Sequence, residues 1–178
     1  MAGPGRQVVL TGAPGGGKTT LLDAAEQEGF SVSREVAREI LRQPGGMALR
    51  ERDPLGFAHA MAEAHLDEMA RFAGHAGAVI FDRGLPDVAG FLRVSGLSVP
   101  PAVDRACREM RYSGPILRTP AWRDIYRQDA ERTQSWEEAV ASDAAVTAAW
   151  EDYGYRVVTL PLAPVAERLA RLQALARV

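Results

Sequence analysis

A phosphate-binding motif lies near the start of the sequence. Residues 12–19 are Gly-Ala-Pro-Gly-Gly-Gly-Lys-Thr, which has the spacing G-x-x-x-x-G-K-[ST] between an apolar run and a helix-forming run. In such a loop backbone N–H groups surround the phosphates, the lysine reaches the β- and γ-phosphates, and the threonine hydroxyl binds Mg²⁺. No Asn-Lys-x-Asp guanine motif is present, which favours ATP. The residues expected to contact ATP here are Gly12, Ala13, Pro14, Gly15, Gly16, Gly17, Lys18, Thr19 and Thr20.

An aspartate follows a second apolar run, Val79-Ile80-Phe81. A strand that delivers an aspartate to its carboxyl end is the usual metal-holding partner of a phosphate loop, and that end of an open α/β sheet is where ligands bind. We therefore expect Thr19 and Asp82 to hold Mg²⁺. The alternative is that Asp82 caps the helix that begins near Leu85.

Charged residues follow the short apolar segment 30–33. Glu35 and Arg38 lie one helical turn apart at the same expected edge of the sheet. Either Glu35 or Asp82 could orient a substrate hydroxyl and accept its proton, and Arg38 could steer a phosphate. The alternative is a solvated helix face with local ion pairs.

Arg83 and Asp87 lie four residues apart directly after Asp82. Arg83 could clamp a substrate anion or pair with a carboxylate, and Asp87 is then the candidate partner. The predicted substrate-binding residues are Glu35, Arg38, Arg83 and Asp87. The predicted catalytic residues are Lys18, Glu35, Asp82 and Arg127.

The segment 120–134 is dense in charge. Arg123 and Arg127 have i,i+4 spacing, which predicts a shared helix face on which like charges repel mildly. A triphosphate, or nearby acids such as Asp124, would offset that repulsion. Arginines that close over a nucleotide fit a lid that excludes water from phosphoryl transfer. The arginines expected to contact the nucleotide are Arg123, Arg127 and Arg132.

The elements that must position these residues alternate between strands and helices, which predicts a parallel sheet with helices on both faces. Strands are expected at 7–11, 30–33, 77–81, 116–117 and 155–160. Helices are expected at 18–28, 34–42, 53–72, 85–97, 101–111, 135–150 and 165–176. Helix-end signals support three of these boundaries: Gly29, the pair Asp53-Pro54, and the capping box of Ser135 and Glu138.

Length and composition limit the function classes. The 178 residues suit one domain with its own core, and a net charge of −2 argues against nucleic-acid binding. Cys107 cannot form an internal disulfide. It lies in a helical pattern and is expected to be a small packed residue rather than a nucleophile. His59, His65 and His75 lack metal-ligand spacing and are expected to be surface or packing residues. With no apolar leader and no long apolar run, we expect a cytoplasmic protein without membrane contact.

Four stretches together carry a family resemblance. Residues 12–19, 34–39, 81–87 and 125–132 resemble the small bacterial predicted ATPases of the AAA-like P-loop group over nearly the whole chain. That group is in turn similar to the nicotinamide riboside kinase domain of bacterial NAD regulators, mainly over its first half. Unlike true AAA+ machines, the sequence shows no helical lid domain and no sensor or arginine-finger segment, so we expect no ring-forming mechanical ATPase.

The resemblance implies an α/β P-loop NTPase fold, a kinase-like three-layer sandwich with a parallel five-stranded sheet in the order 2-3-1-4-5. It also implies ATP and Mg²⁺ at residues 12–20 and Asp82, with lid arginines near Arg127 and Arg132. We treat residues 1–178 as one such domain, in which a helical insertion at about 34–75 walls the acceptor pocket and a lid lies at about 120–134.

The expected function is transfer of the ATP γ-phosphate to a hydroxyl of a small, nucleoside-like metabolite. Its partners would be the nucleotide and that acceptor, and a protein partner or a homodimer stays open. Two alternatives predict different behaviour. A nucleotide-dependent switch, or slow ATPase, would hydrolyse ATP without an acceptor and act through a protein partner. A nucleic-acid end kinase would bind with steep salt dependence.

Overall fold

The computed structural model describes residues 5–127 and 134–177. Its five strands are parallel and form one sheet in the order β2-β3-β1-β4-β5, which confirms the α/β P-loop fold and the strand order that the resemblance implied. The strands are β1 (Gln7–Gly12), β2 (Ser31–Ser33), β3 (Val79–Asp82), β4 (Ile116–Thr119) and β5 (Val157–Thr159). The helices are α1 (Lys18–Gln27), α2 (Val36–Arg42), α3 (Gly46–Arg52), α4 (Pro54–Arg71), α5 (Leu85–Val94), α6 (Pro101–Glu109), α7 (Trp136–Asp152) and α8 (Val165–Ala176).

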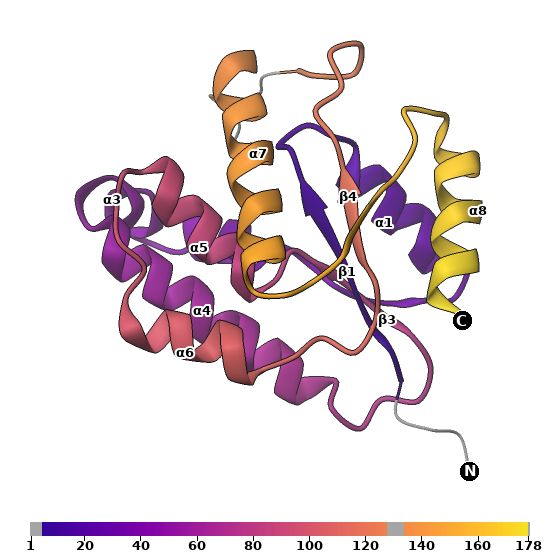
Figure 1. Cartoon of the computed structure of the whole chain (residues 1–178), viewed down its shortest axis with the longest axis horizontal. Coiled ribbons are helices and arrows are strands. Elements are labelled where there is room, and N and C mark those ends of the chain that lie inside the picture. The colour runs from indigo at the N-terminus through magenta and orange to yellow at the C-terminus, as the bar shows by residue number, and fades with distance from the viewer. Residues whose placement is uncertain (1–4, 128–133, 178) are drawn as a thin grey trace.

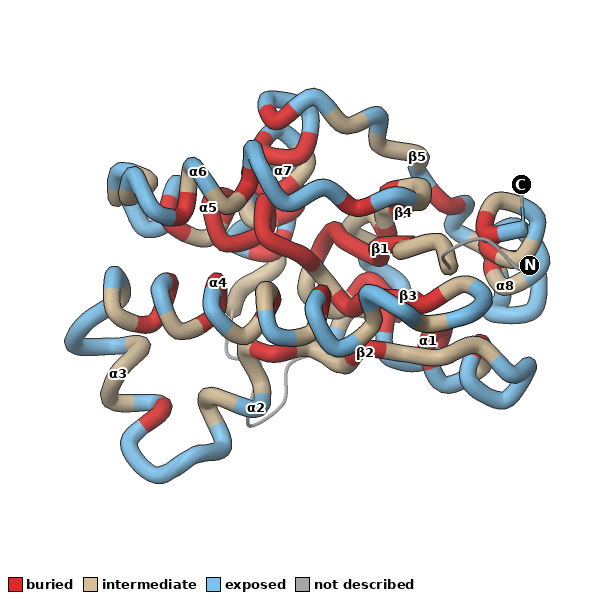
Figure 2. The backbone as a smooth tube through the Cα atoms, turned by 90° about the horizontal axis from the view of Figure 1, so that it is seen from below, coloured by how far each residue is buried: buried red, intermediate tan, exposed pale blue. Residues whose placement is uncertain are grey.

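Helices cover both faces of the sheet, as its apolar strands require (Figure 1). Successive strand residues point to opposite faces, so Leu10 packs with α1 and α8, while Val9 packs with α4 to α7. Figure 2 shows the buried residues concentrated along β1, β3 and the helix surfaces that meet them. The result is a rigid platform whose carboxyl edge carries the loops of interest.

The strand register places the two main motifs next to each other. Leu10 of β1 pairs with Asp82 of β3, and the backbone N–H of Arg83 donates to the carbonyl of Leu10 at 2.8 Å. The phosphate loop leaves β1 at Gly12, two residues beyond Leu10. The ends of β1 and β3 therefore open at the same point of the sheet edge, where open α/β sheets bind ligands.

Several predicted helix ends are confirmed. Gly29 has a φ of 88° just beyond α1. The Asp53 side chain accepts from the Gly56 N–H at 2.9 Å, with Pro54 as the first residue of α4. Ser135 and Glu138 form the expected capping box at the start of α7. Cys107 is fully buried in α6, and burial raises the pKa of its thiol to about 12, so it is a packing residue as predicted.

Three local predictions are wrong. Helix α2 begins at Val36 rather than at residue 34, with Glu35 at its N-cap. A helix that was not predicted, α3, follows directly, because Gly45 adopts a φ of 82° and its carbonyl accepts from the Leu49 N–H. Residues 123–125 form a turn rather than a helix, so Arg123 and Arg127 do not share a helix face.

Among the described helices, none is both long and apolar enough to cross a membrane.

Candidate active site

The lysine of the phosphate loop, Lys18, hydrogen-bonds back to the loop itself. Gly17 adopts a φ of 81° and begins α1, so the chain turns sharply and directs the first N–H groups of the helix at the loop. Lys18 is 7% exposed, and its ammonium donates to the carbonyl of Ala13 at 2.7 Å. Burial and the charge of Arg83 lower the pKa of Lys18 to about 8, against the raising effect of Asp82, Glu35 and Asp87. Lys18 is the single lysine of the sequence.

Asp82 is buried beside this loop and is incompletely bonded. It is 5% exposed, and its Oδ1 atom has no hydrogen-bond partner within the described part of the chain. Burial and the charge of Glu35 raise the pKa of Asp82 to about 6, although Lys18 and Arg83 oppose the rise. A buried carboxylate oxygen without a partner is costly, and a hard cation would satisfy it. Asp82 thus suits the Mg²⁺ role predicted from the sequence.

Asp82 does not cap the following helix. Gly84 is the N-cap of α5, and its backbone N–H donates to Asp87 Oδ2 at 3.0 Å, so the first turn of the helix is capped by Asp87. The alternative explanation of Asp82 as a helix cap is therefore wrong.

Arg83 holds the centre of the site in an uncommon backbone conformation. It is the one non-glycine residue among the described ones with a positive φ, 70°, a conformation that costs about 1–3 kcal/mol. Its guanidinium pairs with Asp87 at 3.0 Å and with Glu35 at 3.3 Å, and donates to the Gly12 carbonyl at 3.1 Å. Burial would lower the pKa of Arg83, but these acids outweigh burial and raise it. Arg83 thus ties three segments of the sheet edge together.

Asp87 has protein partners on both carboxylate oxygens. Oδ1 accepts from the Thr11 hydroxyl at 2.6 Å as well as from Arg83, and Oδ2 accepts from the indole N–H of Trp150 at 2.9 Å as well as from the Gly84 N–H. Asp87 also lines the cavity. The sequence predicted that it binds substrate, and that stays a prediction; from its contacts we infer that Asp87 positions Arg83.

Glu35 lies at the rim of the same network. Its Oε2 atom accepts from Arg38 Nε at 3.0 Å, and its Oε1 atom accepts from Arg83. Burial would raise the pKa of Glu35, but the charges of Arg83, Lys18 and Arg38 outweigh burial and lower it. Glu35 is thus an ionised carboxylate with both oxygens oriented. The ion pair with Arg38 was expected from their spacing, and the pair with Arg83 was not.

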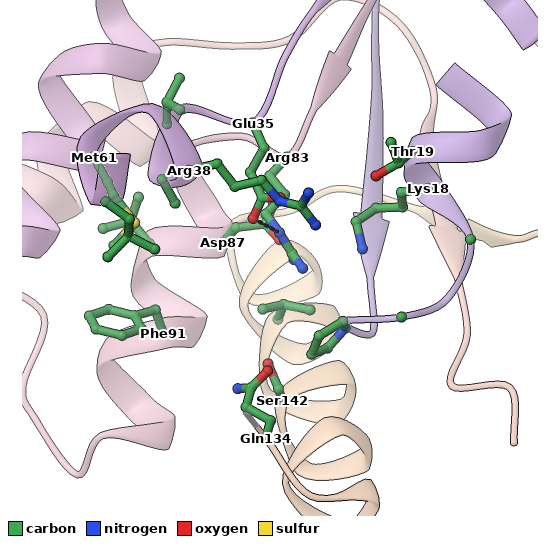
Figure 3. A pocket seen from close by; sticks show the side chains of 18 of the residues that line it. Lys18, Thr19, Glu35, Arg38, Met61, Arg83, Asp87, Phe91, Gln134 and Ser142 are labelled. Atoms are coloured by element: carbon green, nitrogen blue, oxygen red, sulfur yellow. Dashed lines mark hydrogen bonds and ion pairs between the residues drawn. The ribbon is translucent and has the colours of Figure 1, made fainter. Parts of the chain in front are cut away.

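One cavity of about 870 Å³ contains these groups, near the upper end of the roughly 300–1,000 Å³ usual for small-molecule sites. Lys18 and Thr19 lie on one side of it, Met61 and Phe91 lie on the other, and the Glu35–Arg83 network lies between them (Figure 3). We call the first side the phosphate half and the second the acceptor half. Asp82 does not line the cavity, whereas Glu35 does.

Two of the predicted lid arginines, Arg123 and Arg127, do not line the cavity. Arg123 is exposed and stacks over Trp136 at 5.2 Å, and Arg127 is exposed and donates to the carbonyls of Asp124 and Tyr126. From the same segment Trp122, Ile125 and Gln134 line the cavity. Arg132 lies outside the described residues. The predicted nucleotide contacts of Arg123, Arg127 and Arg132 therefore stay predictions.

Arg168 is a cavity residue that the sequence analysis missed. It is 3% exposed, donates to the Gly16 carbonyl at 2.9 Å, and leaves Nε without a partner among the described residues. Its guanidinium lies so close to the loop that a Cβ at Gly17 would come within 2.7 Å of it. The sequence did contain a signal for it. Arg168, Leu172 and Ala176 are spaced four residues apart, so the arginine lies on the same face of α8 as two buried apolar residues. We infer that Arg168 fixes the shape of the phosphate loop.

Arg168→Met should weaken ATP binding by roughly tenfold or more, because a hydrogen bond from a charged donor is worth about 1.5–3 kcal/mol. Titration with a fluorescent ATP analogue measures this directly. Arg171→Met, an exposed residue of the same helix, is the control and should bind like the wild type. Equal affinities for the two variants would show that α8 does not support the loop.

No group of three or more acidic, histidine or cysteine side chains that could hold a metal occurs in the described residues. His59 is exposed, His75 bonds to the Ser31 hydroxyl at 2.9 Å, and His65 is buried and lines the cavity. His65 is therefore neither a surface residue nor merely part of the core.

Several known structures have a similar fold, among them two proteins named as kinases. NadR protein in complex with NR has a TM-score of 0.72 and 18% identity over 98% of this chain, which spans 50% of NadR. Deoxyadenosine kinase from M. mycoides with the products dCMP and dCDP has a TM-score of 0.70 and 13% identity, covering 94% of this chain and 97% of the kinase. Thymidylate kinase from Candida albicans has a TM-score of 0.63 and 10% identity, covering 98% and 92% of the two chains. At these identities the likeness establishes the fold.

No curated protein matches the sequence. A family model described as an AAA domain matches residues 7–168, a stretch that contains all five strands, the phosphate loop and Asp82. The phosphate loop, the sheet order and this match together place the chain in the AAA domain family, as a small P-loop protein with a kinase-like fold.

Proposed function

We propose that the protein transfers the γ-phosphate of ATP to a hydroxyl group of a small molecule, with Mg²⁺ as cofactor. The observation that carries this proposal is a cavity that joins the phosphate loop to a largely apolar chamber, with an ionised carboxylate between them. A simple ATPase needs a place for water beyond the phosphates, but it does not need an apolar chamber. The kinase fold of the structural neighbours supports the same choice.

Nucleotide binding falls to the phosphate half. The N–H groups of the loop would surround the β-phosphate, and Lys18 would exchange the Ala13 carbonyl for phosphate oxygens. Trp122, Ile125 and Pro164 line the cavity on this side and would pack against the rest of the nucleotide. Segment 120–134 would act as the lid, with Arg123, Arg127 and Arg132 as its candidate phosphate contacts.

Thr19 and Asp82 would hold the metal ion. The hydroxyl of Thr19 faces the cavity from the first turn of α1, and Asp82 supplies the unpartnered buried oxygen. When bound, Mg²⁺ would neutralise charge on the β- and γ-phosphates. Magnesium dependence is part of the proposal.

Glu35 is our candidate for the base. It lines the cavity between the two halves, its lowered pKa keeps it ionised at neutral pH, and Arg38 and Arg83 fix its orientation. In the proposed step the acceptor oxygen bonds to the γ-phosphorus while the bond to the β–γ bridging oxygen breaks. ADP leaves, and the hydroxyl proton passes to Glu35.

Helices α2, α3 and α4 would wall the acceptor, as expected for the insertion at 34–75. That the 178 residues work as one domain, and that the protein is cytoplasmic, stay predictions.

The experiment that tests the function is acceptor-dependent ADP release over a panel of nucleosides and hydroxyl-bearing antibiotics. A kinase consumes ATP faster only when the right acceptor is present, whereas a switch or slow ATPase hydrolyses at the same rate throughout.

Glu35→Gln should lower acceptor-dependent turnover by roughly 10²–10⁴-fold, because the amide cannot take the proton. Background hydrolysis of ATP should persist, since it does not use that base. Coupled ADP release with and without acceptor separates the two rates. Glu39→Gln, an exposed glutamate of α2, is the control. If Glu35→Gln matches the control, Glu35 belongs to the ion-pair network alone.

A further inference from the structure

His65 is a buried polar side chain that the proposed mechanism does not use. It lies on α4, is 4% exposed and lines the cavity, yet its ring nitrogens have no hydrogen-bond partner among the described residues. Buried polar groups are almost always hydrogen-bonded in native proteins. The ring nitrogens of His65 are not among the fully enclosed atoms that lack a partner, so they reach the cavity, where a ligand would supply their hydrogen bonds.

The imidazole is uncharged at neutral pH. Burial lowers the pKa of His65 to about 4, helped by the charge of Arg83 and opposed by the charges of Asp87 and Glu35. A neutral ring has one N–H donor and one nitrogen acceptor. It can therefore exchange hydrogen bonds with an amide, hydroxyl or ring nitrogen, but it offers no charge to pair with an ionic group.

The neighbours of His65 on α4 indicate what kind of molecule carries the group that bonds to it. Phe57, Met61 and His65 follow one another at four-residue intervals and all line the cavity, so they form one stripe along the helix. Phe91 of α5 meets Phe57 edge to face, with 5.5 Å between ring centroids. The stripe thus runs from an apolar, aromatic end to His65, whose electrostatic neighbours are Asp87, Arg83 and Glu35.

An acceptor that fits this stripe has three parts. A flat or cyclic apolar portion would pack on Met61 and Phe91, which face the phosphate half across the cavity in Figure 3. An uncharged polar group on that ring would lie at His65, because an isolated charge buried there would have no counter-ion from this side chain. A hydroxyl group would lie at Glu35, facing the ATP.

We propose that His65 is a specificity-determining residue of the acceptor half, which hydrogen-bonds an uncharged heteroatom of a ring-bearing alcohol such as a neutral nucleoside. This inference rests on the proposed kinase function, because it assumes that the apolar chamber holds the acceptor.

The test is binding of four neutral nucleosides, adenosine, guanosine, cytidine and thymidine, to the full chain by calorimetry in the presence of Mg²⁺ and a non-hydrolysable ATP analogue. Ribose alone, which has the hydroxyls without the ring, is the matched probe. We expect at least one nucleoside to bind and ribose not to bind. His65→Phe should weaken nucleoside binding by roughly tenfold or more, since a buried hydrogen bond to the ligand is lost.

Two further variants separate recognition from packing. His65→Gln retains a donor and an acceptor and should bind more tightly than His65→Phe. His59→Gln, on the exposed face of the same helix, should bind like the wild type. All three should keep the wild-type affinity for the ATP analogue. The ¹⁵N resonances of the His65 ring, identified by their absence in His65→Gln, should shift when the nucleoside is added.

The outcomes are distinguishable. If the wild type does not bind the ATP analogue, the proposed function itself fails. If it binds the analogue but none of the nucleosides, or if His65→Phe binds nucleosides as the wild type does, the assignment of His65 is overturned while ATP binding stands. Unchanged ring resonances on nucleoside binding would also overturn it.

Discussion

Lys18→Ala should lower ATP-dependent turnover by at least roughly 10²–10³-fold, because the charge that develops on the phosphates loses a fixed, buried ammonium. ATP affinity should fall as well. The fold should survive, since within the described part of the chain the lysine ammonium hydrogen-bonds to the Ala13 carbonyl of its own loop. Coupled ADP release and binding of a fluorescent ATP analogue measure the two effects.

Arg105→Ala, which removes an exposed positive charge on α6, is the control for net charge. Because Lys18 is the only lysine, an amine-reactive label adds an independent readout. ATP should protect one side-chain site in the wild type, and that site should be missing from the variant. A folded Lys18→Ala protein with wild-type turnover and affinity would contradict the assignment of the phosphate loop.

Asp82→Asn should lower the apparent affinity for Mg²⁺, or the Mg²⁺-dependent rate, by about a hundredfold or more, since even groups that only support a metal ligand cost 10–100-fold. ATP binding without metal should be retained. A Mg²⁺ titration of turnover measures the change, and Asp67→Asn, an exposed aspartate of α4, is the control.

The same variant should be more heat-stable than the wild type when no ligand is present. The pKa of Asp82 is raised in the folded state, so the folded protein holds this proton more tightly than the unfolded chain does. The carboxylate therefore opposes folding as the pH rises from about 4 through 6, and a neutral amide removes that penalty. Loss of activity together with a lower Tm would instead indicate that Asp82 mainly supports the fold.

The sequence predicted those parts of the site that are formed by residues close together along the chain. The phosphate loop, Asp82 at the end of a strand, and the pairs Glu35–Arg38 and Arg83–Asp87 all follow from spacings of a few residues. Such spacings bring side chains together wherever the expected strand, loop or helix forms, as it does at these positions.

Other parts depend on long-range packing and were not predictable from a single sequence. Arg83 meets Glu35 across 48 residues, and Arg168 meets the phosphate loop across 152. His65 and His59 both lie on α4, but His65 is on the side that lines the cavity and His59 is on the exposed side. The sequence cannot tell these two sides apart until the position of α5 and the cavity is known. The i,i+4 arginines at 123 and 127 indicated a helix, but spacing alone does not make one, and the chain turns there.

The contact between Arg168 and Gly16 has a consequence for how the site comes into being during synthesis. Gly16 and Arg168 lie 152 residues apart, so the loop is synthesised well before α8. Closing so long a loop must wait until the intervening sheet has formed. A nascent chain in which α8 has not yet formed would therefore carry the complete motif without the Arg168 contact, so tight nucleotide binding would begin only after α8 has packed against the loop.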